Sequence, residues 1–277
     1  VASTFRVMRA PKGEPPLPRA DMCRQARPAS RARTAPLIAR QATVIYVDVD
    51  GVLNIGIREP GLSPLLLAKQ NCDAAIGAHH HGGPGSCDES VERLVSVLRH
   101  SHRGSGAETY GDLVCRDGGH CADVLVARLA EVIRSAGQRR AVVLSSTWRH
   151  PRHAQLVKDL EADISRHLGQ DFEFDARTEL VPEVSAPQRL RCIGEHLRRL
   201  AGERTWHGRE RLRVVVLDDL SISPLDGWVC GRRQVSSRSD AEAYLCDCVR
   251  AAAPLLDVEA KMVHCYAEWG TASGLRL

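Results

Sequence analysis

The sequence lacks the long apolar segment that a membrane-spanning helix requires. Such a helix needs about 20 consecutive apolar residues, whereas the unbroken apolar runs here are short, as at Ala141–Leu144. Cysteine is also sparse, with 10 in 277 residues, and no two cysteines have Cys-x-x-Cys spacing. A disulfide scaffold and a zinc ribbon are therefore disfavoured. We expect reduced thiols, no membrane partner and an intracellular, cytoplasmic location.

Net positive charge is confined to the first 40 residues. Residues 1–40 contain eight Arg and one Lys against two acidic residues, a net charge of +7; the chain total is +4, so residues 41–277 carry −3. A globally basic nucleic-acid binder is disfavoured, because the charge lies on a Pro-, Ala- and Arg-rich segment without apolar periodicity. We expect residues 1–40 to be disordered. Their Arg enrichment is also typical of an organelle transit peptide, which would make the location organellar.

Strands and helices are predicted to alternate along the chain. Three runs rich in β-branched residues, at residues 43–47, 141–144 and 214–217, predict buried parallel strands. Apolar residues with helical spacing are Val91, Leu94, Val95 and Leu98; Leu125, Leu129, Val132 and Ile133; Leu156, Leu160 and Ile164; and Leu190, Ile193, Leu197 and Leu200. Ser239–Glu242 has capping-box spacing and predicts a last helix through about residue 255. The pattern favours an α/β, Rossmann-like fold, a parallel sheet with helices on both faces.

One segment, from about residue 55 to 119, breaks this alternation. It contains three consecutive histidines within residues 79–85, a Gly-Ser-Gly sequence at 104–106, and only one convincing helical pattern. We expect loops and an insertion here, near the top of the sheet. The sequence pattern as a whole predicts one domain over residues 41–260 that includes this insertion, followed by a tail at 261–277.

Each of the three predicted strands is followed at once by polar residues. Asp48 and Asp50 follow the first strand, residues 145–147 (Ser-Ser-Thr) the second, and Asp218 and Asp219 the third. In open α/β sheets ligands bind outside the carboxyl ends of the strands, so we expect these side chains to converge. Converging carboxylates repel one another unless a cation is present, and hard oxygen ligands suit Mg²⁺. A magnesium site formed by the four aspartates is therefore predicted.

Three segments resemble motifs of the haloacid dehalogenase-like (HAD) superfamily. Residues 48–54 (Asp-Val-Asp-Gly-Val-Leu-Asn) resemble its first motif, residues 143–149 (Val-Leu-Ser-Ser-Thr-Trp-Arg) its second and residues 216–219 (Val-Leu-Asp-Asp) its fourth. The Asp-Gly-Val-Leu-Asn and Ser-Ser-x-Trp-Arg segments are most similar to the HAD domain of Swiss army knife RNA-repair proteins. The resemblance covers about residues 43–257. It implies a HAD fold with a small cap or none.

The resemblance also implies roles for the first motif and the metal site. Asp48 would be the nucleophile that forms an aspartyl-phosphate. Asp50 would act as general acid and base and would bind Mg²⁺ through its backbone carbonyl. Gly51 would permit the close turn that follows these two aspartates, and it would lie among the substrate-binding residues. Asp219, with Asp218 beside it, would complete the metal site.

The second motif would supply the contacts to substrate. The hydroxyl of Ser145, with Ser146 as the alternative, would bind a phosphoryl oxygen. Thr147 would lie beside them in the same substrate-binding segment. Trp148 and Arg149 either pack beside the site, where Arg149 would suit a second phosphate or a polynucleotide backbone, or belong to the core and its rim.

A basic residue is also implied, to hold the phosphate and the nucleophile. In the similar proteins it opens a helix of the form Arg-x-x-Glu-Ile-x-x-Trp-Leu, a frame that residues 189–197 fit with Arg189 as the basic residue. Cys192 stands where Glu is expected and His196 where Trp is expected. Arg191 is the alternative to Arg189.

The activity implied is that of a Mg²⁺-dependent phosphatase, a phosphoric monoester hydrolase. A small cap leaves the site open to a bulky phosphorylated substrate, such as a nucleic-acid end or a phosphoprotein, by analogy alone. Two alternatives stay open: an interaction or scaffold module of the same fold without turnover, and a phosphotransferase. The intact acidic set favours the enzyme over the scaffold. The sequence defines neither the substrate nor the oligomeric state.

Overall fold

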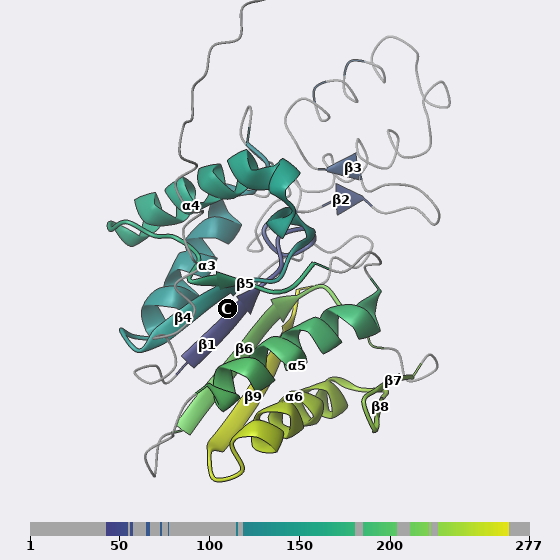
Figure 1. Ribbon diagram of the computed structural model, residues 1–277. Helices are drawn as coiled ribbons and strands as arrows, with labels where there is room; N and C mark the ends of the chain where they lie inside the picture. Colours follow the sequence, from purple (N-terminus) through teal and green to yellow (C-terminus); the bar gives the residue numbers. More distant parts are fainter. Residues whose placement is uncertain are drawn as a thin grey trace, which may run out of the picture. The chain divides into compact units, whose positions relative to one another are not determined.

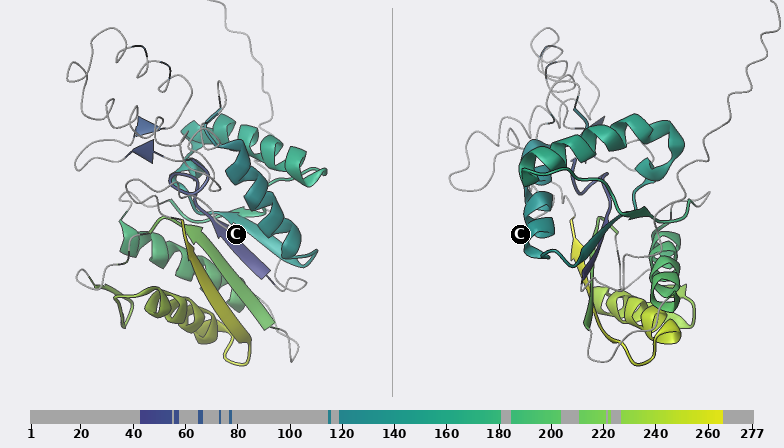
Figure 2. Two further views of the ribbon diagram at one scale, coloured as in Figure 1. Left: turned by 180° about the vertical axis from the view of Figure 1, so that it is seen from behind. Right: turned by 60° about the vertical axis from the view of Figure 1, so that its left-hand side comes forward.

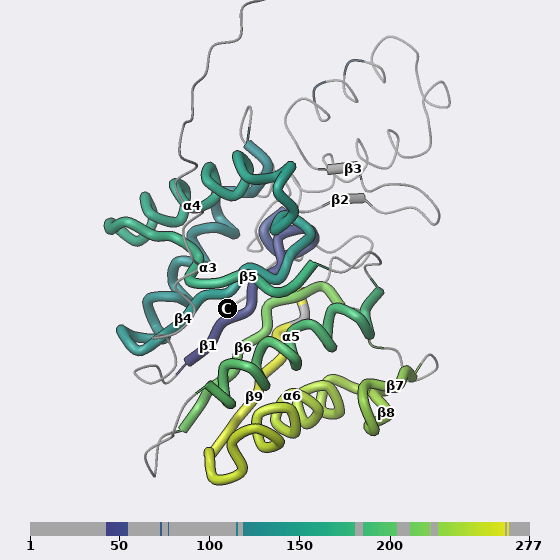
Figure 3. Tube along the Cα trace, in the orientation of Figure 1, coloured from purple at the N-terminus to yellow at the C-terminus, as the bar shows by residue number. Residues whose placement is uncertain are grey.

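The computed structural model describes residues 43–54, 56–57, 65–66, 73, 77, 115, 119–180, 185–203, 211–220, 222 and 227–265. The chain divides into the units Val1–Ala32 and Arg33–Leu277, and all described residues belong to the second. Figure 3 follows them along the Cα trace. The segment 1–40, the histidine-rich stretch at 79–85 and the helix expected at 91–98 lie outside the described residues, as does most of the expected insertion.

Five parallel strands form the central sheet (Figure 1). They are β1 (Thr43–Val47), β4 (Arg140–Leu144), β5 (Ala176–Arg177), β6 (Arg211–Asp218) and β9 (Asp257–His264), in the order β5-β4-β1-β6-β9. This confirms the predicted α/β, Rossmann-like class. From β1 the chain builds outward through β4 to β5, and then crosses to β6 on the other side of β1. Ligands of open α/β sheets bind outside the strand ends where the direction of winding switches, here between β1 and β6.

Helices cover both faces of the sheet, as predicted (Figure 2). One face carries α3 (Asp123–Ser135) and α4 (Ala154–Leu168), and the other carries α5 (Ala186–Gly202) and α6 (Arg238–Ala252). Side chains alternate along β1: Ile45 and Val47 pack in the core with α3 and α4, whereas Val44 and Tyr46 pack with α5 and α6. Burial on both faces explains why the sequence of this strand is apolar without interruption.

The predicted helical stripes fall on α3, α4 and α5. A short 3₁₀ turn, Pro151–His153, precedes α4.

The capping box predicted for the last helix is wrong. The N-cap of α6 is Ser237, whose Oγ accepts the amide of Asp240 at 3.2 Å, so Ser239 already lies inside the helix. Glu242 instead accepts the amide of Met262 in β9 at 2.9 Å, and the helix ends at residue 252 instead of 255.

Strand β9 was not predicted from the sequence. Its residues Val258, Ala260 and Met262 are buried in the core with α6, whereas the intervening Glu259 and Lys261 are exposed. This alternation with period 2 is typical of a strand with one buried face. The expected domain boundary at residue 260 lies inside β9.

Two small antiparallel pairs lie outside the main sheet. β2 (Gly56–Ile57) pairs with β3 (Leu65–Leu66), and β7 (Trp228–Cys230) pairs with β8 (Arg233–Val235). The β7–β8 hairpin packs against α5 and α6. None of the helices in the described ranges combines the length and the apolar character that crossing a membrane requires.

A buried polar pair joins α5 to β1. The hydroxyl of Tyr46 and Nδ1 of His196 lie 2.8 Å apart, and the side chain of His196 is buried. Burial, reinforced by the charge of Arg199, lowers the pKa of His196 to about 4. Among the described residues, Cys248 also acts on this pair, and it raises the pKa of Tyr46 together with burial. His196 therefore folds in its neutral form, and protonating it opposes folding.

We predict that this histidine makes the protein less stable in mild acid. The unfolded chain binds a proton near pH 6.5 and the folded chain near pH 4, so stability is lost as the pH falls through this window. Between pH 7 and pH 5 the loss is about 2 kcal/mol. In urea unfolding at both pH values, His196→Gln, which keeps a hydrogen-bond partner for Tyr46, should lose less stability than the wild type. The exposed His150→Gln is the control, and equal losses in wild type and His196→Gln would contradict the prediction.

Candidate functional site

The carboxyl ends of three adjacent strands place Asp48, Ser145 and Asp218 in one row. Val47 is in register with the last apolar residues of β4 and β6, so the next residue of each strand lies at the same level. Backbone hydrogen bonds continue this register. The amide of Ser145 donates to the carbonyl of Val47 at 2.8 Å, and the amide of Asp48 to that of Leu217 at 2.9 Å. The row lies at the switch point between β1 and β6, where the fold favours ligand binding.

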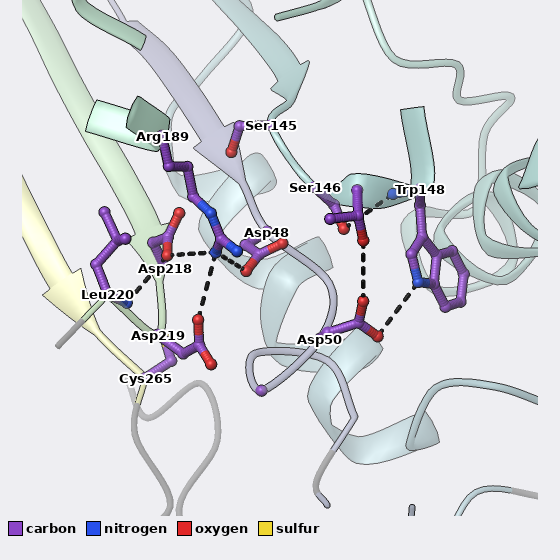
Figure 4. Close-up of polar contacts among 12 residues, drawn as sticks. Asp48, Asp50, Ser145, Ser146, Trp148, Arg189, Asp218, Asp219, Leu220 and Cys265 are labelled. Atoms are coloured by element: carbon purple, nitrogen blue, oxygen red, sulfur yellow. Dashed lines mark hydrogen bonds and ion pairs between the residues drawn. The ribbon is translucent and has the colours of Figure 1, made fainter. Parts of the chain in front are cut away.

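Arg189, in the first turn of α5, is the cation that meets this row (Figure 4). Its Nη1 donates to Oδ2 of Asp48, to Oδ1 of Asp218 at 2.8 Å and to Oδ1 of Asp219 at 3.3 Å. We call these three acids the aspartate cluster. Their side chains are at most 8% exposed, and that of Arg189 is 14% exposed. Of the two arginines considered from the sequence, Arg189 reaches the cluster, whereas Arg191 lines a different pocket.

Among the described residues, three buried carboxylates share one guanidinium at this site. Burial, with the charges of Asp219 and Asp50, raises the pKa of Asp48 to about 6 despite the opposing effect of Arg189. Burial and the charge of Asp48 also raise the pKa of Asp218. Burial disfavours the charged form of Arg189, but attraction to the cluster outweighs it and raises the pKa of the guanidinium. A second cation would relieve the remaining negative charge.

The donor set fits a divalent cation. One carboxylate oxygen from each of Asp48, Asp218 and Asp219 lies within 4.8 Å of the other two. Oδ2 of Asp218 is buried and makes no hydrogen bond within the described part of the chain. A buried polar atom without a partner is costly, and carboxylate oxygens are the ligands that Mg²⁺ prefers. The aspartate cluster could therefore hold the metal ion that the sequence predicts.

Gly51 brings the turn after β1 against the cluster. Its φ is +85°, in the left-handed region that residues with a Cβ rarely adopt. A Cβ at this position would lie 2.5 Å from Oδ2 of Asp219. The amide of Gly51 donates to Oδ1 of Asn54 at 3.0 Å. Both the backbone conformation and the contact with Asp219 therefore require glycine here.

Asp50 directs its carboxylate away from the cluster, toward the segment after β4 (Figure 4). Oδ1 accepts from Nδ2 of Asn54 at 3.0 Å and from Nε1 of Trp148 at 3.2 Å. Oδ2 accepts from the hydroxyl of Thr147 at 3.3 Å. Asp50 was expected to reach the metal through its backbone carbonyl, and its side chain is not one of the three that converge. These bonds fix the orientation of the Asp50 carboxylate.

The two serines of the second motif differ in their bonding. Oγ of Ser145 is buried and makes no hydrogen bond to the described residues. Oγ of Ser146 accepts the amide of Trp148 at 3.3 Å and caps the short 3₁₀ helix Thr147–Arg149. Ser145 therefore has the hydroxyl that is available to an incoming ligand. This difference favours Ser145 over Ser146 for a phosphoryl contact.

Arg149 binds backbone in place of the expected substrate. Its Nη1 donates to the carbonyls of Ser145 at 2.7 Å and Ser146 at 2.5 Å, and its Nε to that of Glu179 at 3.1 Å. Only 6% of the residue is exposed. Arg149 thus holds the strand end on which Ser145 lies, and it corresponds to the rim arginine that was the alternative in the sequence.

Asn54 and the indole of Trp148 were not identified from the sequence as partners of Asp50. Asn54 bonds Asp50, the amide of Gly51 and the carbonyl of His120, and is 1% exposed. The available signal was its place three residues after a glycine turn, where asparagine side chains often bond to the backbone. The contact of Trp148 joins residues 98 apart in sequence and has no local signal.

Comparison with protein-family models, with curated proteins and with solved structures gives no match for this chain. The relationship to the HAD superfamily therefore remains a resemblance of motifs. The structure shows a five-stranded parallel α/β sheet with a buried aspartate cluster at its switch point.

We predict that Asp219→Asn weakens Mg²⁺ binding roughly tenfold or more, because it removes one charge from the donor set and keeps its shape. The measurement is the rise of the thermal midpoint with increasing MgCl₂. Asp171→Asn, which removes a charge at an exposed position, is the control and should behave as the wild type. A Mg²⁺ dependence that is identical in all three proteins would show that the ion does not bind at the cluster.

Proposed function

We propose that the protein is a Mg²⁺-dependent phosphohydrolase of the HAD type, acting through an aspartyl-phosphate. The observation that carries the proposal is the placement of Asp48. Asp48 directly follows β1 at the switch point of the sheet, and its carboxylate contacts Arg189. A second carboxyl, Asp50, lies two residues on and is held by separate donors. A nucleophile and an acid–base group are thus supplied by one turn of the chain.

In the first step, an oxygen of Asp48 attacks phosphorus. The bond between phosphorus and the leaving oxygen breaks, and its electron pair stays on that oxygen. Arg189 orients Asp48 through Nη1, and the unpartnered hydroxyl of Ser145 donates to a phosphoryl oxygen. When bound by the aspartate cluster, Mg²⁺ would offset the charge between carboxylates and phosphate.

Asp50 in its acid form gives its proton to the leaving oxygen. Two donors occupy Oδ1, whereas among the described residues Oδ2 is bonded by the hydroxyl of Thr147 alone, which can accept as well as donate. The proton therefore belongs on Oδ2. Trp148 and Asn54 keep the carboxyl in one orientation, which general acid catalysis requires.

In the second step, water replaces the leaving group. Asp50, now ionised, takes a proton from the water as its oxygen attacks phosphorus. The bond between phosphorus and Asp48 breaks, so inorganic phosphate leaves and both aspartates return to their starting forms. Phosphoryl transfer is in this way divided into two displacements.

The proposed substrate is a phosphoric monoester. The residues that would form a cap lie largely outside the described part of the chain, so a bulky substrate such as a nucleic-acid end remains a hypothesis from the sequence. A panel of nucleotides, 5′- and 3′-phosphorylated oligonucleotides, sugar phosphates and phosphopeptides discriminates between the substrate classes. Release of inorganic phosphate to water, rather than transfer to an added alcohol, distinguishes a hydrolase from a phosphotransferase.

We predict that Asp48→Asn abolishes hydrolysis of an aryl phosphate while the fold persists, because the change is nearly isosteric and relieves repulsion within the cluster. Asp50→Asn should slow turnover by about 10²- to 10⁴-fold, as expected for the loss of a general acid and base. Rates are measured with and without Mg²⁺, and circular dichroism checks the fold.

Beryllofluoride, which mimics an aspartyl-phosphate, provides the matched control. With Mg²⁺ it should raise the thermal midpoint of the wild type and of Asp50→Asn, but not that of Asp48→Asn. Unchanged turnover in Asp48→Asn, or equal protection of all three proteins, would favour the scaffold interpretation.

A further inference from the structure

We propose that a groove between α5 and α6 binds a small phosphorylated ligand of about nucleotide size. The groove has a volume of about 660 Å³, and the turn of the β7–β8 hairpin also lines it. Figure 1 shows the positions of α5, α6 and this hairpin. Pockets that hold small-molecule ligands have volumes of roughly 300–1,000 Å³. The groove shares no residue with the aspartate cluster or with Arg189. The proposal therefore does not rest on the proposed function.

One stripe of each helix forms the walls of the groove. The lining residues are Arg191, Gly194, Glu195 and Arg198 of α5; Tyr244, Asp247, Cys248 and Ala251 of α6; and Cys230, Gly231, Arg232 and Arg233 of the hairpin. Within each helix the spacing is i, i+3, i+4 and i+7, which places side chains on one face. The stripe of α5 is separate from its core-facing residues, such as Ile193 and Leu197.

The floor of the groove is uncharged. A Cβ on Gly194 would lie 2.8 Å from Sγ of Cys248 and 2.9 Å from Cε1 of Tyr244, so glycine allows these side chains to approach the backbone of α5. Tyr244 and Cys248 hydrogen-bond each other. Burial raises the pKa of Cys230 to about 11 and also raises that of Cys248, so both thiols stay neutral at physiological pH. A neutral floor with an aromatic ring suits the non-ionic part of a ligand.

The rim of the groove carries an excess of positive charge. Four of the lining residues are arginines and two are acids. Arg233 binds Asp247, with Nη2 and Oδ2 2.6 Å apart. For Arg191, Arg198 and Arg232, no carboxylate of the described residues lies within the 4.0 Å of an ion pair. Even with Glu195 counted, the groove has two positive charges in excess.

Arginine is the residue that fits phosphate best. Its planar guanidinium donates two parallel hydrogen bonds to phosphate oxygens, and such charge-assisted bonds are stronger than neutral ones. Arg191 and Arg198 come from α5 and Arg232 from the hairpin turn, so a bound phosphate would join two separate elements. Three arginines that have no acidic partner among the described residues suit a ligand with more than one negative charge, such as a nucleoside di- or triphosphate.

The test is calorimetric titration of the full chain with inorganic tripolyphosphate, ATP, adenosine and a single-stranded oligonucleotide, in chelator. Without metal the aspartate cluster is negative and repels anions, so binding reports on the groove. Tripolyphosphate and ATP should bind saturably and adenosine should not. The double variant Arg198→Gln/Arg232→Gln should weaken binding roughly tenfold, since two exposed charge contacts are lost.

The control is Arg139→Gln/Arg213→Gln. This double variant removes two exposed arginines that lie beside Thr43, at the start of β1, and do not line the groove, so binding should be unchanged. Circular dichroism checks that both double variants fold. Absence of saturable binding, or an equal loss in the control, would overturn the proposal. Binding of the oligonucleotide alone, sensitive to the groove variant, would also overturn it and indicate a nucleic-acid surface.

Discussion

The burial of three carboxylates around one guanidinium is the constraint on which the rest of the site depends. Removing one partner of a buried ion pair costs about 3–5 kcal/mol, so α5 must begin where Arg189 reaches the strand ends. The start of α5 is fixed by a cap: Oε1 of Gln188 accepts from both the amide and the hydroxyl of Ser185, at 3.3 and 3.1 Å. The capping residues thus set the position of Arg189, the cation that contacts the aspartate cluster within the described part of the chain.

The register of the sheet turns three local motifs into one site. Because Val47 pairs with Leu144 and with Leu217, the residues that follow β1, β4 and β6 share a level. Shifting a strand by one residue would exchange the faces of its side chains and move the acid away from Arg189. Tyr46, whose hydroxyl bonds His196 of α5, ties β1 to the same helix. The apolar core that fixes the register therefore also positions the site.

Those parts of the molecule that depend on local pattern could be predicted. The apolar strands, the helical stripes and the polar residues at strand ends all have short-range signals. Edge strand β9 follows α6 closely and has charged residues on its exposed face, so its apolar signal is weaker than that of the central strands. The contacts of Asp50 with Trp148 and of Arg149 with Glu179 depend on how distant segments pack, so the sequence motifs identify these residues but not their partners.

Two arginines on α5 show how helix geometry separates two charged regions. At 3.6 residues per turn, side chains two positions apart point about 200° apart around the axis. Arg189 therefore meets the aspartate cluster at the sheet edge, while Arg191 faces the groove beside α6. The sequence frame favours Arg189 and leaves Arg191 as the alternative, and the structure places the two side chains on different sides of the helix. A substitution that removes the charge of Arg191 changes the electrostatic potential of the groove directly. Its effect on the aspartate cluster is weaker, because the two charges are separated by the helix and screened by salt.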